Sequence, residues 1–222
     1  MAIASLEQEI LDIFDLSAKN YRYKEGIKKI EKIVEIHPEL KNESVLSELG
    51  FLYDHLALQQ KNKLLRNKYE EKAFNLYRGA LKKNRESINA IWGIGRIWWH
   101  RKNRKAVKYA IKAANLMKKL HGSAGLMLQN VGLVYEALGD IKRAEQWYLR
   151  GLKEEPNNFG GYYNLLNFHH KQERREEVQR LLPAFKKLYQ KETTKFKKTS
   201  WGKDILKKIK ELEQFVLLHT KK

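Results

Sequence analysis

The sequence predicts an all-α fold made of antiparallel helix pairs. Apolar residues recur at helical intervals along most of the 222 residues, and no stretch alternates apolar and polar side chains as a strand would. In addition, one pattern of small and aromatic residues returns several times along the chain. Such a recurrence indicates a repeat architecture, in which each helix pair buries its apolar side against its neighbours.

The clearest copy of the pattern occupies residues 125–158. Its characteristic residues, in order, are Gly132, Tyr135, Gly139, Ala144, Tyr148, Gly151 and Pro156. The small residues let the two helices of a pair approach closely, while the tyrosines fill the space between helices. Gly139 is expected to form the turn, and proline ends the second helix because it cannot continue one.

Four further copies are expected at about residues 7–40, 43–87, 88–120 and 159–192. The copy at 43–87 contains 11 additional residues, and its stretch Asp54–Lys72 has neither Gly nor Pro. We therefore expect two lengthened helices around a polar turn near Gln59–Lys63. The register of the copy at 88–120 stays open by one residue, and the last copy is degenerate because it lacks the Gly and Tyr of the pattern.

The chain is expected to end in a basic connector and a capping helix over residues 193–222. After the connector at 193–203, an apolar stripe is formed by Ile205, Ile209, Leu212 and Val216. This stripe predicts a helix from about Asp204 to Leu218 that covers the last copy. The chain as a whole, residues 1–222, is thus expected to be a single solenoid domain of about eleven helices.

The pattern resembles the tetratricopeptide repeat (TPR), a helix–turn–helix unit of about 34 residues. The resemblance implies a right-handed superhelical solenoid of about five repeats, whose first helices line a concave groove. It also implies a non-enzymatic scaffold or adaptor that binds a peptide or helix of another protein in that groove.

Asn130 and Asn164 are the most specific candidates for contact with a partner. They stand 34 residues apart, each directly before the apolar pair of a first helix. An amide at this position can both donate to and accept from a peptide backbone. The alternative is that both are ordinary surface asparagines. The complete set of expected groove residues is Trp92, Arg96, Gln129, Asn130, Leu133, Tyr163, Asn164, Asn167, His170 and Lys171; Glu136 is expected beside them.

The charge of the chain is +19, and it is unevenly distributed. Residues 61–118 contain 17 basic and 3 acidic side chains, a net charge of +14, and residues 186–222 contain 12 and 4, a net charge of +8. Such blocks favour an acidic partner, and the alternative function is an RNA- or ribosome-associated helical-repeat protein that uses them. A Lys-rich solvated surface without a specific role is the other interpretation.

A rim patch in the turn of the third copy is the candidate site for an anion or a nucleic acid. It consists of Arg101, Lys102, Arg104 and Lys105. Trp92 and Trp99 lie nearby in the sequence, and aromatic side chains among basic ones can stack on bases. Trp98, in contrast, is expected in the core.

Other functional classes receive little support from the sequence. The chain has no cysteine, which excludes disulfides and thiolate chemistry and is typical of a cytoplasmic protein. No apolar run is long enough to span a membrane. His169 and His170 are adjacent, so they diverge on a helix and cannot bind one metal ion together. We expect no cofactor, no metal and no catalytic site; the oligomeric state stays open.

Overall fold

The computed structural model describes residues 3–218, and within this range it contains helices and no strands. The α-helices are α1 Ile3–Lys19, α2 Tyr23–Ile36, α3 Glu43–Leu58, α4 Lys63–Lys83, α5 Ile88–His100, α6 Lys105–His121, α7 Gly125–Ala137, α8 Ile141–Glu154, α9 Phe159–Lys171, α10 Arg175–Lys191, α11 Thr194–Lys198 and α12 Ser200–Leu217. The all-α prediction is confirmed for the described residues. One helix more than expected forms, because the five-residue α11 lies in the expected connector.

Short polar side chains set the starting points of the helices. Asn42 Oδ1 accepts a hydrogen bond from the backbone N–H of Val45 at 3.0 Å, and Asp140 Oδ1 accepts from that of Arg143 at 3.1 Å. These caps satisfy backbone donors that have no partner inside the helix. The turn before α8 needs Gly139, whose φ of +78° lies in the left-handed region.

The pair α3–α4 shows how the 11 additional residues are accommodated. α3 ends at Leu58 and α4 begins at Lys63, so the polar turn lies at the expected place. α4 has 21 residues and is the longest helix in the part of the chain that the structure describes. The additional residues therefore extend the helices and do not form an irregular loop.

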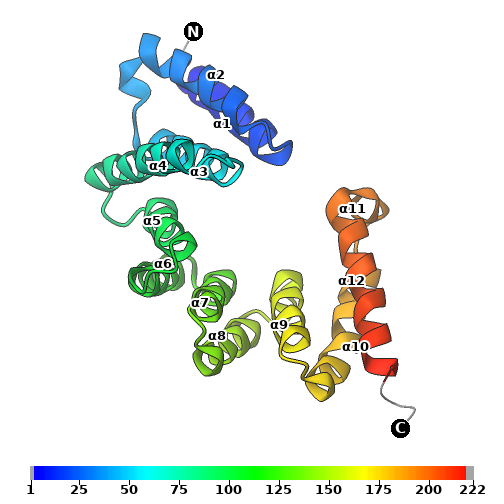
Figure 1. Ribbon diagram of the computed structural model, residues 1–222. Coiled ribbons are helices and arrows are strands. Elements are labelled where there is room, and N and C mark those ends of the chain that lie inside the picture. Colours follow the sequence, from blue (N-terminus) through cyan, green and yellow to red (C-terminus); the bar gives the residue numbers. More distant parts are fainter. Residues whose placement is uncertain (1–2, 219–222) are drawn as a thin grey trace. The chain divides into compact units, whose positions relative to one another are not determined.

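The chain divides into two compact units, residues 1–116 and 117–222, and the division falls within α6. In the first unit α1 packs on α2, α3 packs on α4, and α5 contacts both α3 and α4 (Figure 1). Its core contains residues of all five helices, among them Ile10, Ile30, Leu52, Tyr77 and Ile94.

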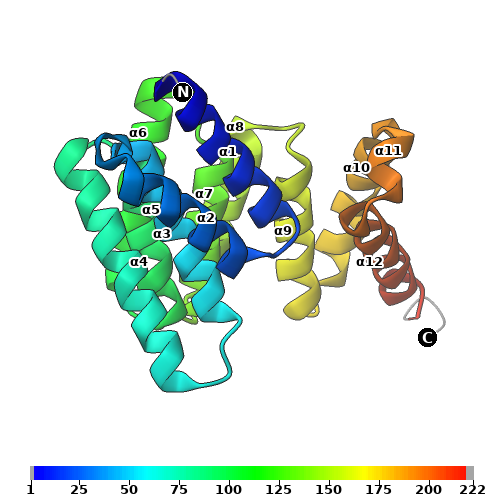
Figure 2. The same cartoon turned by 90° about the horizontal axis from the view of Figure 1, so that it is seen from above.

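The second unit contains the pairs α7–α8 and α9–α10 and the terminal helix α12. α12 lies beside α10 in both views (Figure 1 and Figure 2). Ile205 and Leu212 are fully buried and Ile209 almost so, against Val178 and Phe185 of α10. The expected capping helix is confirmed, although it begins at Ser200, four residues before the expected start.

Candidate binding pocket

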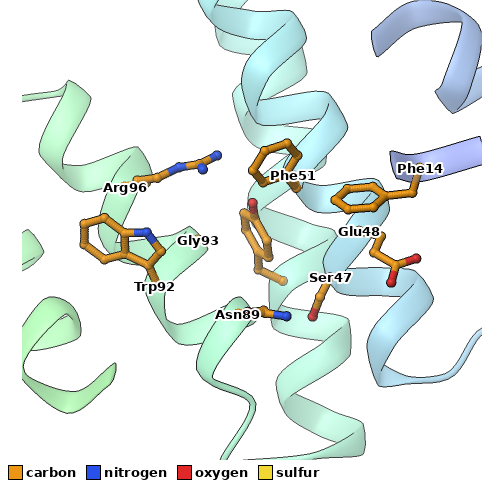
Figure 3. A pocket seen from close by; sticks show the side chains of 9 residues that line it. Phe14, Ser47, Glu48, Phe51, Asn89, Trp92, Gly93 and Arg96 are labelled. Atoms are coloured by element: carbon orange, nitrogen blue, oxygen red, sulfur yellow. The ribbon is translucent and has the colours of Figure 1, made fainter. Parts of the chain in front are cut away.

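A pocket of about 350 Å³ opens between the first helices of the first unit, α1, α3 and α5. In Figure 3, Trp92 and Arg96 of α5 lie across the pocket from Phe14 of α1 and Glu48 of α3. The complete lining consists of Phe14, Ser47, Glu48, Phe51, Tyr77, Asn89, Trp92, Gly93 and Arg96. Aromatic walls with a few polar groups are typical of a binding site.

Two glycines allow the helices around the pocket to pack on Tyr77 of α4. A Cβ atom at Gly50 of α3 would lie 2.7 Å from Tyr77 Cε1, and one at Gly93 of α5 would overlap the Tyr77 ring. The phenol is therefore clamped between two backbones, and its side chain is 2% exposed. Burial raises the pKa of the Tyr77 hydroxyl, so the group is neutral at physiological pH.

Arg96 lines the pocket, but its charge is already paired. Its Nε donates to Asp54 Oδ2 at 2.9 Å, and its Nη2 donates to the same oxygen. The guanidinium also lies 4.9 Å from the centre of the Phe51 ring. The Arg96 side chain is only 12% exposed and that of Asp54 1%. Arg96, expected among the groove residues, lines the pocket, and its guanidinium also ties α5 to α3.

Glu48 carries a buried acceptor without a donor. Its Oε1 accepts from Ser44 Oγ at 3.0 Å, whereas its Oε2 is shielded from solvent and has no partner among the described residues. Burial raises the pKa of Glu48 to about 7, and the negative charges of Asp15 and Glu43 act in the same direction. This carboxyl group therefore keeps its proton to a higher pH than an exposed glutamate does.

Asn89 and Trp92 stand three residues apart on α5 and offer groups that nothing else uses. Asn89 is exposed, and its amide makes no hydrogen bond within residues 3–218. Trp92 is half-buried and stacks on Trp99 two turns further along, with ring centres 6.3 Å apart. The pair therefore combines a free amide with a fixed aromatic surface, two features that suit contact with a peptide.

The second unit holds the other expected groove residues. Asn130, Leu133, Asn164 and Asn167 are all half-buried, so neither asparagine of the expected ladder lies in a closed core. The Asn130 amide has only a weak contact, at 3.6 Å, with Met127 Sδ. Whether these amides hold a peptide stays a prediction.

Gln129 does not face a groove, which corrects the sequence-based expectation. Its side chain is 1% exposed, and its Nε2 donates to the backbone oxygen of Tyr148 at 2.9 Å. The hydrogen bond crosses from α7 to α8, so the amide joins the two helices of the pair. A partner cannot reach it without opening this pair.

The terminal helix α12 occupies part of the face assigned to a partner. The Tyr163 ring meets Trp201 at 5.0 Å, and the His170 ring meets Phe215 at 4.7 Å. Lys171 is exposed, but its Nζ lies 2.8 Å from Glu136 Oε1. Tyr163 and His170 therefore pack on the chain itself, which the sequence pattern of α9 alone did not indicate.

The rim patch is exposed at all four positions, Arg101, Lys102, Arg104 and Lys105. Two of them also have internal contacts. Arg101 pairs with the buried Glu70 at 2.9 Å, and Lys105 Nζ lies 4.8 Å from the centre of the Trp98 ring. Trp98 packs against the core of the first unit as expected. Lys61, in the turn before α4, and Lys63, the first residue of α4, lie beside Arg101 around a depression of about 320 Å³.

Several lining residues of the pocket were not identified from the sequence, although they stand at fixed spacings from the glycine in the first helix of their copy. Trp92 stands three residues before Gly95, and Ser47 stands three before Gly50. Arg96 and Phe51 each follow those glycines directly. Applying the same offset to the copy at 43–87 would have found Ser47 and Phe51; Phe14 has no such marker, because the first copy lacks the glycine.

No three His, Asp or Glu side chains of residues 3–218 lie close enough together to hold a metal ion. In the same range, the helices are too short or too polar to cross a bilayer.

The fold is similar to that of several solved structures, although the sequence matches no known family. No protein-family model matches the sequence, and the curated proteins give no match either. Among solved structures, Pseudomonas aeruginosa PilF aligns with a TM-score of 0.63 and 12% identity, over 98% of this chain and 94% of its own. A chain of the Naa15/Naa10 complex bound to HypK-THB aligns at 0.50 and 19%, over 93% of this chain and 29% of its own.

A third structure supplies the particular type of helical repeat. TTC0263, a thermophilic TPR protein of Thermus thermophilus, aligns with a TM-score of 0.53 and 14% identity, over 73% of this chain and 98% of its own. At such identities the likeness concerns the fold. The chain has the fold of tetratricopeptide-repeat proteins, as its glycine and tyrosine pattern predicted.

Proposed function

We propose that this protein is a non-enzymatic scaffold that binds a segment of a partner protein through the pocket of α1, α3 and α5. The observation that carries the proposal is the free amide of Asn89 beside Trp92, in a pocket with aromatic walls. Asn89 can hydrogen-bond to a peptide backbone, and Trp92, Phe14 and Phe51 can accommodate an apolar side chain. The likeness to a chain of the Naa15/Naa10 complex supports the same class of function, since that protein is seen in an assembly.

The test is to select binding peptides from a random displayed library and to measure their affinities by fluorescence anisotropy. Trp92→Ala should weaken the selected peptides by about 30-fold, the effect of losing an aromatic hot spot. Trp147→Ala is the matched control, because Trp147 is a half-buried tryptophan on α8, outside the pocket, and is covered by Arg150 at 4.9 Å. Equal affinity of the wild type and the Trp92 variant would contradict the proposal.

The same peptide-binding experiment also tests the two asparagines of the second unit. If Asn130 and Asn164 hold a peptide on the second unit, Asn130→Ala combined with Asn164→Ala should weaken the peptides that bind there by about 30-fold, given about 1 kcal/mol for each of two lost hydrogen bonds. The melting temperature should not change, because both side chains are only half-buried. Unchanged affinity for every selected peptide would mean that they are ordinary surface residues.

A second candidate function, association with RNA, is favoured by one observation. The turns before α4 and α6 bring Lys61 and Lys63 onto the same surface as Arg101 of the rim patch. Because Arg101 neutralises the buried Glu70, the best test leaves it in place. Lys61, Lys63, Lys102 and Arg104 are changed to Glu instead, and the affinity for a short RNA is measured across a salt series.

If this surface binds RNA, the four changes should weaken binding to all sequences alike. They should also flatten the salt dependence, by a log–log slope of about 0.7 for each lost phosphate contact. Reversing four exposed lysines outside both basic blocks, Lys19, Lys41, Lys142 and Lys153, serves as the control of equal charge. Similar losses in both variants would mean that only the total charge matters.

A further inference from the structure

The longest helix creates a second groove, on the face formed by α2, α3 and α4, which lie side by side (Figure 1 and Figure 2). Its volume is about 760 Å³. It is lined by Lys24, Ile27, Lys28, Glu31, Lys32 and Glu35 of α2, Tyr53 and Leu56 of α3, and Leu65, Lys68, Tyr69 and Lys72 of α4. None of these residues belongs to the pocket of α1, α3 and α5.

One wall of this groove comes from the stretch that makes the second copy longer than the others. Leu65, Lys68, Tyr69 and Lys72 all lie within the stretch Asp54–Lys72, which makes this copy longer than the others. The stretch that lengthens this copy therefore contributes these four residues to the lining of the groove.

The floor of the groove is apolar and held in place. Ile27 and Leu56 are each 5% exposed, and Leu65 is half-buried beside them. Tyr53 joins the three helices, because its hydroxyl donates to Glu31 Oε1 at 2.6 Å and accepts from Lys72 Nζ at 3.2 Å. An apolar segment of a partner would meet a preformed surface there.

The rims of the groove are lysine rows without counterions. Lys24, Lys28 and Lys32 follow one another at four-residue intervals on α2, so they share one helix face at spacings of about 6 Å. These three and Lys68 of α4 are exposed and form no ion pair or hydrogen bond within residues 3–218. Like charges held together in this way favour an anionic partner.

We propose that this groove binds an acidic amphipathic helix of a partner protein. A helix with Glu or Asp at i and i+4 repeats its charges at the same interval of about 6 Å as the lysine rows. Its apolar stripe would cover Ile27, Leu56 and Leu65. One feature opposes a nucleic acid in the same place: the floor is apolar, and a phosphate backbone offers no apolar stripe to cover it.

The probe is a fluorescein-labelled helical peptide with a leucine stripe flanked by glutamates at i and i+4; its matched control has glutamine at every glutamate. Affinities are measured by anisotropy with the full chain at about 150 mM salt, where exposed charges further apart than about 8 Å are largely screened. The acidic probe should bind at least about tenfold more tightly than the glutamine probe. Equal binding of the two probes, or no binding of the acidic probe, would overturn the proposal.

Charge reversals then locate the site. Lys28→Glu with Lys68→Glu changes both rims, whereas Lys19→Glu with Lys82→Glu changes the net charge equally at exposed positions outside the groove. The rim variant should lose at least about tenfold in affinity and the control less than about twofold. Similar losses in both would overturn the proposal, since overall charge would then explain the binding.

Two further measurements separate the remaining outcomes. Lys28→Gln with Lys68→Gln removes the charges without introducing new ones, and it should weaken the acidic probe in the same direction if the rims are correctly assigned. A short single-stranded RNA is titrated against the same variants. Stronger binding of RNA than of the acidic probe, lost in the rim variant, would assign the groove to nucleic acid and overturn the proposal. The groove is distinct from the pocket around Trp92, so failure here leaves the proposed scaffold function standing.

Discussion

Arg96 of α5 donates from both Nε and Nη2 to a single carboxylate oxygen of Asp54 on α3. Both side chains are shielded from water, so each charge has the other as its counterion. This ion pair connects two first helices of the first unit, and its arginine lines the pocket. It also explains why a basic residue is tolerated at a position where most of the side chain is buried.

We predict that Asp54→Ala lowers the free energy of unfolding by about 3–5 kcal/mol, because it leaves a buried guanidinium without a counterion. Urea unfolding measures the loss. Combining Asp54→Leu with Arg96→Met removes both charges and should be less destabilising than Asp54→Ala alone. Asp54→Leu and Arg96→Met are also measured singly. If the loss of stability in the double variant equals the sum of these two single losses, the side chains are not coupled.

The second prediction concerns pH. The folded state raises the pKa of Glu48 to about 7, so between about pH 4.5 and 7 the folded chain binds a proton that the unfolded chain has released. The contribution of Glu48 to stability therefore falls as the pH rises through this window. Glu48→Gln, which mimics the protonated form, should raise the melting temperature at pH 8 and leave it nearly unchanged at pH 4.5.

The variant must be compared with the wild type at each pH, because buried histidines act in the opposite direction. Burial lowers the pKa of His55 and His169, so their contribution to stability falls as the pH drops. Glu71→Gln on the exposed face of α4 is the control. A constant difference between Glu48→Gln and the wild type from pH 4.5 to 8 would contradict the prediction.

The third prediction compares two glycines in helices. A Cβ at Gly93 would overlap the Tyr77 ring, so Gly93→Ala should cost about 1–3 kcal/mol through overpacking. A Cβ at Gly79 of α4 meets only Leu46 Cδ1 at 3.4 Å, and Gly79→Ala should instead be neutral or stabilise by up to about 1 kcal/mol through helix propensity. Chemical denaturation of both variants shows whether each substitution lowers or raises the free energy of unfolding. Equal effects would mean that α5 does not require the close approach.

The fourth prediction tests whether α12 is part of the fold. Leu212 is fully buried against the second unit, so Leu212→Ala should cost about 2–4 kcal/mol. Leu217 is 63% exposed on the same helix, and Leu217→Ala should change stability by less than about 0.5 kcal/mol. Removal of residues 200–222 should lower the melting temperature and the solubility. An unchanged melting curve after truncation would show that α12 is detachable.

The helices could be predicted from the sequence because their signals are local. The starts of α3 and α8 follow from Asn42 and Asp140, whose side chains accept backbone hydrogen bonds only three residues away. The turn between α3 and α4 appeared at Gln59–Asn62 for a similar reason: a polar stretch interrupts an apolar period. The capping helix was predicted from the spacing of Ile205, Ile209 and Leu212.

The candidate sites could be predicted only in part, because burial depends on neighbours distant in the sequence. Gln129 stands at the same offset from its glycine as Trp92, yet its amide is captured by the backbone of α8, 19 residues later. Tyr163 and His170 have the expected place on α9, but α12 returns to pack on them. The groove of α2 and α4 combines lysines from two helices that no single periodic pattern relates.

The sequence by itself determined the helical architecture and the positions of the turns, since local spacing along the chain decides both. Tertiary structure alone decided which charges are free. Arg96 and Arg101 look alike in the sequence as exposed cations, yet each is paired with a buried carboxylate distant in the sequence, Asp54 and Glu70 respectively. The lysines of α2 that line the groove, in contrast, are not paired with a carboxylate within the described residues. A charge is available to a partner only where folding brings no counterion to it, and that depends on which helices become neighbours.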